Sequence, residues 1–242
     1  MAGWLGRLFR REQEEFPACA AVVPAAGSST RMAGRDKLLE CMGEQPVLVH
    51  TLRALDACPL IAEIVVVTRS DLIVPVGQLC RDCAFSKVTK VVVGGQTRTQ
   101  SVLAGIREVS EHTALVAIHD GARPLVSQQV LEEVIRRAEA CGAAAPGVPV
   151  KDTVKRIQEG MVAATLERDT LVAIQTPQVF QTDLIRAALV RAEEEGVALT
   201  DDCAAVEQLG VPVAVTRGSY ANIKITTPED LLMGEALLRE MD

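Results

Sequence analysis

The sequence predicts a single α/β domain in which a mostly parallel sheet carries helices on both faces. Two observations support this prediction. Runs rich in Val and Ile alternate with segments whose apolar residues recur at the helical period. In addition, 48% of the residues are hydrophobic but only 2% are aromatic, so Ala, Val, Leu and Ile must build the core. Strands that are buried on both faces have this aliphatic composition.

Aliphatic strands and amphipathic helices follow one another along the chain. We expect strands at residues 20–23, 64–68, 88–93, 115–119, 143–148 and 211–216. We expect helices at residues 47–56, 72–81, 99–109, 129–141, 184–195 and 202–209. A last helix has an explicit start, with Thr227 as its N-cap, Pro228 at its first position and Asp230 three residues after the cap. This order of elements is typical of a parallel sheet.

Residues 150–168 break the alternation. Two extended stretches flank Gln158-Glu159-Gly160, which predicts a β-hairpin that projects from the sheet. Projecting hairpins expose strand edges and apolar side chains, so we interpret this one as a dimerisation arm. We expect residues 1–17 to form an N-terminal extension and residues 18–242 to form the domain. The extension is interpreted as a frayed segment, a packed outer helix, or a short amphipathic helix on a membrane or partner.

Composition and charge exclude several classes of protein. A net charge of −7 repels the nucleic-acid backbone, so we expect no nucleic acid polymer as a partner. No apolar run approaches the ~20 residues that span a bilayer, and the N-terminus makes a poor signal peptide. Seven cysteines, an odd number, suit a reducing compartment, and we expect a cytoplasmic protein. Cys80 and Cys83 fit one helix better than a metal site.

The loop after the first strand carries the first candidate site residues, because ligands bind beyond the carboxyl ends of strands in open α/β sheets. This loop has the spacing of neither a P-loop nor a dinucleotide-binding motif. Its small residues 25–29 still let backbone N–H groups approach a triphosphate, and Arg31 and Lys37 supply positive charge. The simpler interpretation is a solvated loop with ordinary surface cations.

Two further strand ends carry polar or charged residues. Gly94-Gly95, Arg98 and Ser101 follow the third strand. The two glycines indicate either a second close approach to a ligand or a simple tight turn. Lys224 follows the late strands, and its position predicts that it faces the same edge of the sheet.

The stretch HDGARP, residues 119–124, ends the fourth strand. A carboxylate beside a nucleotide loop suits Mg²⁺, which prefers oxygen ligands and is usually held by one or two carboxylates plus substrate phosphates. Asp120 is therefore a candidate metal residue, and the alternative is a structural pair between Asp120 and Arg123. His119 is interpreted as packed into the strand end and not as a base.

The chemistry that the sequence lacks also narrows the mechanism. There are only three histidines, no G-x-S-x-G motif and no metal-ligand cluster, so acyl transfer and zinc hydrolysis have little support. Transfer of a nucleotidyl group to a phosphate needs none of these groups, because the attacking oxygen is already ionised near neutral pH. Such catalysis depends on alignment and on charge stabilisation by Arg, Lys and Mg²⁺.

Seven motifs in order over residues 24–232 carry a family resemblance. They are PAAGSSTRM, GGQTRTQSVLAGI, AIHDGARPLV, KDTVKR, QTPQVF, LTDDCAAVE and NIKITTPEDL. Together they resemble the 2-C-methyl-D-erythritol 4-phosphate cytidylyltransferases of the non-mevalonate isoprenoid pathway. The resemblance implies a Rossmann-like nucleotidyltransferase fold and a homodimer joined by the hairpin arm. It also implies that CTP and methylerythritol phosphate react, with Mg²⁺, to give CDP-methylerythritol and pyrophosphate.

The resemblance also implies roles for individual residues. Those implied to be catalytic are Arg31, Lys37, Arg168 and Lys224. Those implied to bind the nucleotide are Ala25, Ala26, Gly27, Gly95, Ser101 and Asp120. Asp120 would also hold the metal, directly or through water. Those implied to bind the sugar phosphate are Arg123, Thr153, Arg168, Thr176 and Thr200. Thr153 and Arg168 would come from the arm of the neighbouring subunit, so the dimer would share its active sites.

The sequence departs from the family pattern at a few positions of the site: Ser29, Asp36, Leu38, Gln100 and Gly121. These departures concern the geometry of the loops and not the class of enzyme. Two other functions stay open. One is a cytidylyltransferase for another polyol phosphate such as ribitol 5-phosphate, and the other is a nucleotide-binding protein without catalytic activity.

Overall fold

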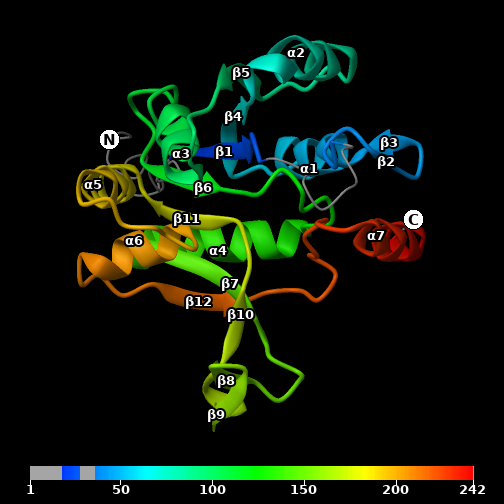
Figure 1. Cartoon of the computed structure of the whole chain (residues 1–242). Helices are drawn as coiled ribbons and strands as arrows, with labels where there is room; N and C mark the ends of the chain where they lie inside the picture. The colour runs from blue at the N-terminus through cyan, green and yellow to red at the C-terminus, as the bar shows by residue number, and fades with distance from the viewer. Residues whose placement is uncertain (1–17, 28–35, 242) are drawn as a thin grey trace, which may run out of the picture.

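The computed structural model describes residues 18–27 and 36–241, and its centre is an eight-stranded mixed sheet (Figure 1). The strands of this sheet are β1 (Cys19–Ala25), β4 (Ile61–Thr68), β5 (Val88–Val93), β6 (Leu115–Ile118), β7 (Ala143–Pro149), β10 (Val172–Ile174), β11 (Gln178–Gln181) and β12 (Ala214–Arg217). Each of the six predicted strands is present, within a few residues of the predicted bounds. The predicted α/β class is therefore confirmed.

The sheet is parallel over the half that contains the cavity described below. β1 pairs in parallel with β4 and β6, and β4 pairs in parallel with β5. β11 runs antiparallel between β6 and β7, β10 is antiparallel to β7, and β12 is parallel to β7. The carboxyl ends of β1, β4, β5 and β6 consequently meet at one edge of the sheet.

Helices cover both faces of the sheet, as predicted. They are α1 (Val47–Asp56), α2 (Ile73–Asp82), α3 (Arg98–Ile106), α4 (Gln128–Cys141), α5 (Thr182–Glu194), α6 (Asp202–Gln208) and α7 (Pro228–Met241). Two short 3-10 turns are η2 (Ser70–Leu72) and η3 (Arg168–Thr170). Alternate residues of β1 enter different cores: Ala21 and Val23 pack with α1, α2 and α4, whereas Val22 packs with α3, α5 and α6.

The last helix begins as its sequence predicts. The Asp230 N–H donates to Thr227 Oγ1 at 3.4 Å, and the Asp230 carboxylate accepts from the Thr227 N–H at 2.9 Å. This reciprocal arrangement is a capping box, which satisfies backbone donors that the first helical turn leaves unpaired. Cys80 lies in α2, as predicted, whereas Cys83 follows the helix directly as its C-cap residue.

The predicted hairpin is present and projects from the body of the molecule (Figure 1). It consists of β8 (Lys155–Gln158) and β9 (Met161–Thr165), joined at Glu159 and Gly160, which both have positive φ angles. A second, smaller hairpin of β2 (Cys41–Met42) and β3 (Gln45–Pro46) was not predicted, because its strands are only two residues long. The N-terminal extension lies outside the described residues. Within the described chain, no helix has the length and apolar character of a membrane span.

Candidate active site

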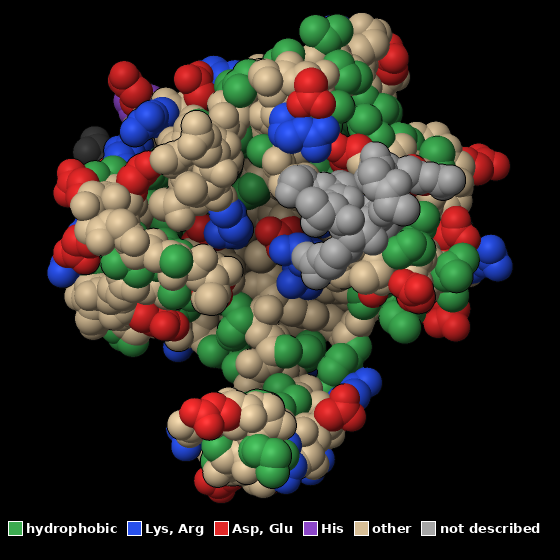
Figure 2. Space-filling view, in the orientation of Figure 1, with side chains coloured by type: hydrophobic (Ala, Val, Ile, Leu, Met, Phe, Trp, Pro, Cys, Tyr) green, Lys and Arg blue, Asp and Glu red, His purple; other side chains and the backbone are tan. Residues whose placement is uncertain are grey.

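A cavity of about 380 Å³ lies beyond the carboxyl ends of β1, β5 and β6. Figure 2 shows a recess in this face, with Lys and Arg side chains on its walls and acidic side chains at its base. Four loops contribute the residues that line it: Pro24, Ala25, Ala26, Gly27, Lys37, Leu38, Gly95, Gln96, Thr97, Arg98, Ser101, Asp120, Gly121, Ala122 and Lys224. The structure therefore brings together all six residues that the resemblance assigns to the nucleotide.

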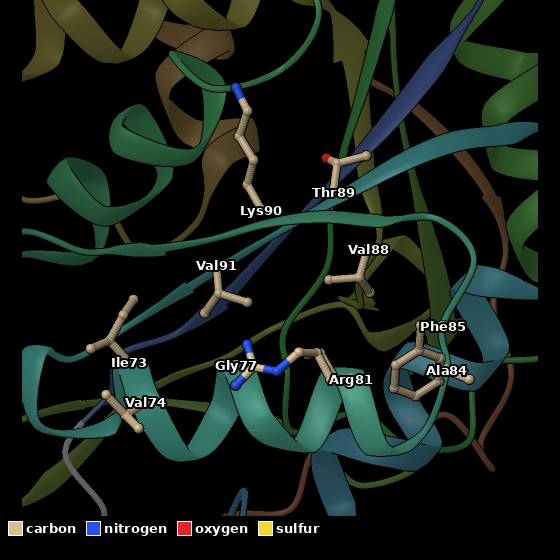
Figure 3. Close-up of a pocket in the computed structure, with 11 residues that line it drawn as sticks. Ile73, Val74, Gly77, Arg81, Ala84, Phe85, Val88, Thr89, Lys90 and Val91 are labelled. Atoms are coloured by element: carbon tan, nitrogen blue, oxygen red, sulfur yellow. The ribbon is translucent and has the colours of Figure 1, made fainter.

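A larger cavity of about 670 Å³ lies between α2 and β5 (Figure 3). Its two charged lining residues are already engaged by neighbours, because Arg81 donates to Gln78 at 2.7 Å and Lys90 pairs with Glu108 at 3.0 Å. Figure 3 also shows Lys90 pointing away from α2. The described residues that line this cavity include no carboxylate, so the smaller cavity is the better candidate for phosphate chemistry.

The first loop contributes small residues and one described cation to the smaller cavity. Ala25 ends β1, and Ala26 and Gly27 continue along the cavity wall, while Arg31 and Ser29 lie outside the described residues. Lys37 lines the cavity from the far end of the loop.

The two departures from the family pattern beside Lys37 anchor its backbone. Asp36 Oδ1 accepts from the Leu38 N–H at 3.1 Å, and its Oδ2 pairs with Arg69 at 2.9 Å. The Leu38 side chain is buried, and its carbonyl accepts from the Leu48 N–H at 3.0 Å. Lys37 is thus held between a residue fixed by an ion pair and one fixed by burial.

The start of α3 forms the opposite wall. Ser101 is buried, and its hydroxyl donates to the Thr97 carbonyl at 2.9 Å. A side chain at Gly95 would clash with Gln100, whose Oε1 accepts from the Gln96 N–H at 2.9 Å. Gly95 is therefore required by this close approach, and Gln100, another departure from the family pattern, braces the loop against the helix.

Asp120 stands among three cations at the base of the cavity. Its Oδ2 lies 2.8 Å from Lys224 Nζ and 3.5 Å from Arg123 Nε, and its Oδ1 lies 3.9 Å from Arg98 Nη2. Burial alone would raise the pKa of Asp120, but the positive charge of Lys224 and the two arginines lowers it to about 2. The carboxylate is thus ionised at neutral pH. The pairing with Arg123 is present, but as part of a larger cluster.

Backbone contacts fix the two cations nearest to Asp120. Arg123 Nη1 donates to the Asn222 carbonyl at 2.7 Å, and Asn222 is fully buried. Lys224 precedes Ile225, which is also fully buried and whose N–H donates to the Ala122 carbonyl at 2.8 Å. The loop after β12 is thereby joined to the loop after β6.

His119 is fully buried, as predicted, and lies below the cluster. Its Nδ1 is 3.0 Å from the Thr176 hydroxyl, which also accepts from the Asp120 N–H at 3.1 Å, and its Nε2 is 3.2 Å from the Arg123 carbonyl. Burial lowers the pKa of His119 to about 4, so the ring is neutral at pH 7. A neutral ring whose Nε2–H donates to the Arg123 carbonyl leaves Nδ1 to accept from Thr176.

Sequence reasoning gave no role to one ion pair at the cavity wall. Arg98 Nη1 and Nη2 donate to Asp202 Oδ1 and Oδ2 at 2.7 and 2.6 Å. Burial alone would lower the pKa of Arg98, but the charge of Asp202 raises it above its usual range. The available signals were a position after a strand for Arg98 and the LTDDCAAVE motif for Asp202, and neither indicates that the two side chains meet.

None of the five residues that the resemblance assigns to the sugar phosphate lines this cavity. Arg123 and Thr176 contact Asp120 beside it, and the other three are Thr153, Arg168 and Thr200. All three are exposed. Arg168 lies at the base of the arm, where its Nη1 donates to the Lys151 carbonyl at 3.2 Å and its Nε is 3.9 Å from Asp169. Thr153 and Arg168, the two residues of the arm, therefore lie outside the cavity of their own chain.

Comparison with known sequences agrees with the residue pattern. The sequence model of the 2-C-methyl-D-erythritol 4-phosphate cytidylyltransferase family matches residues 19–240. The chain is 46% identical over 228 residues to the protein of that name from Desulforamulus reducens, covering 90% of this chain and 95% of the relative. It is 44% identical over 221 residues to the one from Dehalococcoides mccartyi, covering 91% of this chain and 96% of the relative.

Solved structures show the same fold. The 4-diphosphocytidyl-2C-methyl-D-erythritol synthase of Anaerococcus prevotii superimposes with a TM-score of 0.81 at 31% identity, covering 91% of this chain and 96% of that one. The 2-C-methyl-D-erythritol 4-phosphate cytidylyltransferase of Thermus thermophilus superimposes with a TM-score of 0.75 at 32% identity, covering 90% and 98%. The chain therefore belongs to the 2-C-methyl-D-erythritol 4-phosphate cytidylyltransferase family.

Proposed function

We propose that this chain transfers CMP from CTP to 2-C-methyl-D-erythritol 4-phosphate and releases pyrophosphate. The observation that supports the proposal most strongly is the cluster of Asp120 with Lys224, Arg123 and Arg98 at the edge of the parallel strands. With Asp202, which pairs with Arg98, three cations stand beside two carboxylates, and the remaining positive charge suits a polyphosphate ligand. Family membership identifies that ligand as CTP and the acceptor as methylerythritol phosphate.

The reaction needs alignment and charge stabilisation more than proton transfer. An oxygen of the acceptor phosphate attacks the α-phosphorus of CTP, and the bond from that phosphorus to the oxygen bridging to the β-phosphate breaks. Pyrophosphate leaves with the electron pair of that bond. Lys37 and Lys224, with Arg31 from the part of the loop outside the described residues, would stabilise the negative charge that develops on the α-phosphate and the leaving group.

The nucleotide would lie along the small residues of the two loops. Ala25, Ala26 and Gly27 present backbone and no long side chain to the cavity, and Gly95 and Ser101 do the same on the opposite wall. Small residues allow backbone N–H and C=O groups to approach a base and a ribose closely. This wall fits a flat base better than a bulky apolar ligand.

The donor set fits Mg²⁺ that arrives with the nucleotide. Among the described lining residues Asp120 is the only carboxylate, and no group of three or more His, Cys, Asp or Glu in the described chain could hold a metal by itself. Mg²⁺ is usually bound by one or two carboxylates together with substrate phosphates. Asp120 would hold it directly or through water, and the ion would supply charge neutralisation at the phosphates.

The acceptor side is proposed to be shared between two subunits. Arg123 and Thr176 lie beside Asp120 in the same chain, and Thr200 is exposed at the start of the LTDDCAAVE motif. Thr153 and Arg168 would reach the site from the arm of a second copy. Their location outside the cavity of their own chain and the exposed apolar side chains of the arm support this arrangement.

Pyrophosphate release in the presence of Mg²⁺ and CTP tests the proposal. Parallel reactions contain methylerythritol phosphate, ribitol 5-phosphate or no acceptor. We expect release only with methylerythritol phosphate. Release with ribitol phosphate alone would replace the proposed acceptor, and CTP binding without release in any reaction would indicate a binding protein.

A further inference from the structure

The ion pair between Arg98 and Asp202 joins two helix starts at the wall of the cavity. Arg98 is the first residue of α3, and Asp202 is the first residue of α6. Both carboxylate oxygens accept from the guanidinium, at 2.7 and 2.6 Å, so the plane of the guanidinium is fixed as well as its position. The Asp202 side chain is only 1% exposed, whereas that of Arg98 is 33% exposed and lines the cavity.

Asp202 itself is anchored to the sheet. Gln178 of β11 accepts from the Asp202 and Cys203 N–H groups through its Oε1, at 2.9 and 3.0 Å. The Gln178 side-chain amide donates to Asp201 Oδ2 at 2.8 Å, and Asp201 Oδ1 caps α6 by accepting from the Ala204 N–H. The carboxylate that holds Arg98 is therefore carried by a rigid element.

The guanidinium keeps donors for a ligand after it pairs with Asp202. It has five N–H donors, and the two bonds to Asp202 use two of them. Arg98 Nη2 is 3.9 Å from Asp120 Oδ1, beyond hydrogen-bond distance. Three donors thus remain on a side chain that faces the cavity proposed for the nucleotide.

Asp202 also keeps Arg98 from closing on Asp120. Arg98 Nη2 already lies 3.9 Å from Asp120 Oδ1, so without the buried carboxylate the guanidinium would be free to close to hydrogen-bond distance of Asp120. Asp120 Oδ1 would then be occupied by Arg98, as Oδ2 is by Lys224. A second carboxylate behind Arg98 prevents that competition.

We propose that Asp202 is a positioning residue that holds Arg98 in the orientation in which it contacts CTP. The inference rests on the proposed function, since it assumes that the cavity binds the nucleotide. Asp202 acts through Arg98 and does not itself touch the substrate. Its replacement should therefore weaken CTP binding and leave the acceptor nearly unaffected.

The test compares the full chain with Asp202→Asn, which keeps the shape of the side chain but removes its charge. Calorimetry with Mg²⁺ and CTP, without acceptor, should show CTP affinity reduced about 10- to 100-fold. The KM for the sugar phosphate should change less than about twofold, because Asp202 acts on CTP through Arg98. A general loss of folded protein would lower the apparent kcat and would change neither KM value. Asp183→Asn is the matched control, since it removes the same charge from the first turn of α5, where the carboxylate is exposed and pairs with Arg186 at 3.2 Å.

Two variants of Arg98 test whether Asp202 acts through this side chain. In an Arg98→Ala background, Asp202→Asn should have almost no additional effect on CTP affinity, because its influence passes through Arg98. Arg98→Lys, which keeps the charge but cannot form both bonds, should show the same loss of CTP affinity even if Asp202→Asn does not fold. Unchanged CTP affinity in Asp202→Asn or in Arg98→Lys, or full additivity in the double variant, would overturn the proposal. Pyrophosphate release by the unaltered chain tests the proposed function separately. A failure of the proposed function is therefore distinguishable from a failure of the role proposed for Asp202.

Discussion

The residues around Asp120 fall into two groups, one that surrounds its carboxylate and one that holds its backbone. Lys224, Arg123 and Arg98 surround the carboxylate, while His119 and Thr176 hold the backbone beneath it. Lys224 and Arg98 line the cavity, whereas the imidazole and the hydroxyl hydrogen-bond to each other inside the protein. Electrostatic catalysis needs this combination, because donors that are already in place cost no reorganisation during the reaction.

The neutral state of His119 predicts a pH dependence of stability. Its pKa is about 4 in the folded protein against 6.5 for the free side chain, so between these values the unfolded chain binds a proton that the folded chain does not. The free energy of unfolding should therefore fall as the pH drops from 6.5 towards 4, by about 3 kcal/mol from this group. His119→Asn should lack this contribution.

Urea unfolding at several pH values between 7 and 4, with a chelator present, measures the effect. Because Asn loses packing and a hydrogen bond, the variant should be less stable at pH 7, and its deficit should shrink towards pH 4. A deficit that stays constant over the whole range would show that His119 does not carry the predicted shift.

At the scale of elements, the position of α3 depends on a glycine. A methyl group at Gly105 would clash with Val22 Cγ1 of β1 and would lie 2.8 Å from Val67 Cγ2 of β4. The helix packs this closely because residue 105 has no side chain, and Arg98 and Ser101 lie one to two turns earlier on the same helix. Close packing at Gly105 thus sets the distance between the sheet and the cavity wall that α3 forms.

Gly105→Ala should therefore destabilise the protein by about 1–3 kcal/mol and should weaken CTP binding, since the helix must move away from the sheet. Gly77→Ala in α2 is the matched control, because its nearest neighbour is the flexible end of Arg81 at 3.6 Å. That variant should gain about 0.5–1 kcal/mol from lower unfolded-state entropy. Denaturant unfolding and CTP calorimetry distinguish the two. A Gly105→Ala variant as stable as Gly77→Ala would contradict the packing argument.

The sequence pattern predicted the long elements and missed the short ones for a physical reason. Strands such as β4 carry enough consecutive aliphatic residues to be recognised, but β10 and β11 have three and four residues on either side of Pro177. The candidate site residues that directly follow strands were predicted because the carboxyl ends of parallel strands lie at one edge of the sheet. The contact of Arg98 with Asp202 spans 104 positions, and no local pattern encodes it.

On the scale of the whole molecule, the arm and the cavity belong to different parts of one chain. The arm carries the exposed apolar side chains of Ile157, Met161 and Val162, whose exposed fractions are 56%, 73% and 61%. Apolar side chains that project this far from a core are typical of an interface. A second copy of the chain is the proposed partner, and Arg168 is proposed to contact the acceptor in the cavity of that copy.

A mixture of two defective variants tests this sharing. Lys37→Ala is expected to impair the cavity of its own chain, and Arg168→Ala is expected to raise the KM for acceptor of the partner's cavity. After subunit exchange, each heterodimer has one site with both residues intact, so about a quarter of the wild-type activity should return at low acceptor concentration. Each variant alone should stay far below that level. If mass measurements show heterodimers but no activity returns, Lys37 and Arg168 must act in the cavity of the same chain.

The most direct test of the central claim is the rate of pyrophosphate release by Lys224→Met at saturating CTP and methylerythritol phosphate. Lys224 lies 2.8 Å from Asp120 at the cavity. Lys90 pairs with Glu108 and does not line this cavity, so Lys90→Met provides the control. If the cluster neutralises the triphosphate, Lys224→Met should lose about 100-fold or more in kcat while the variant is still folded at the assay temperature, and Lys90→Met should keep wild-type activity. The thermal midpoint of Lys224→Met should fall, because buried Asp120 loses its nearest cation. A folded Lys224→Met variant with wild-type kcat would contradict the assignment of this cavity as the active site.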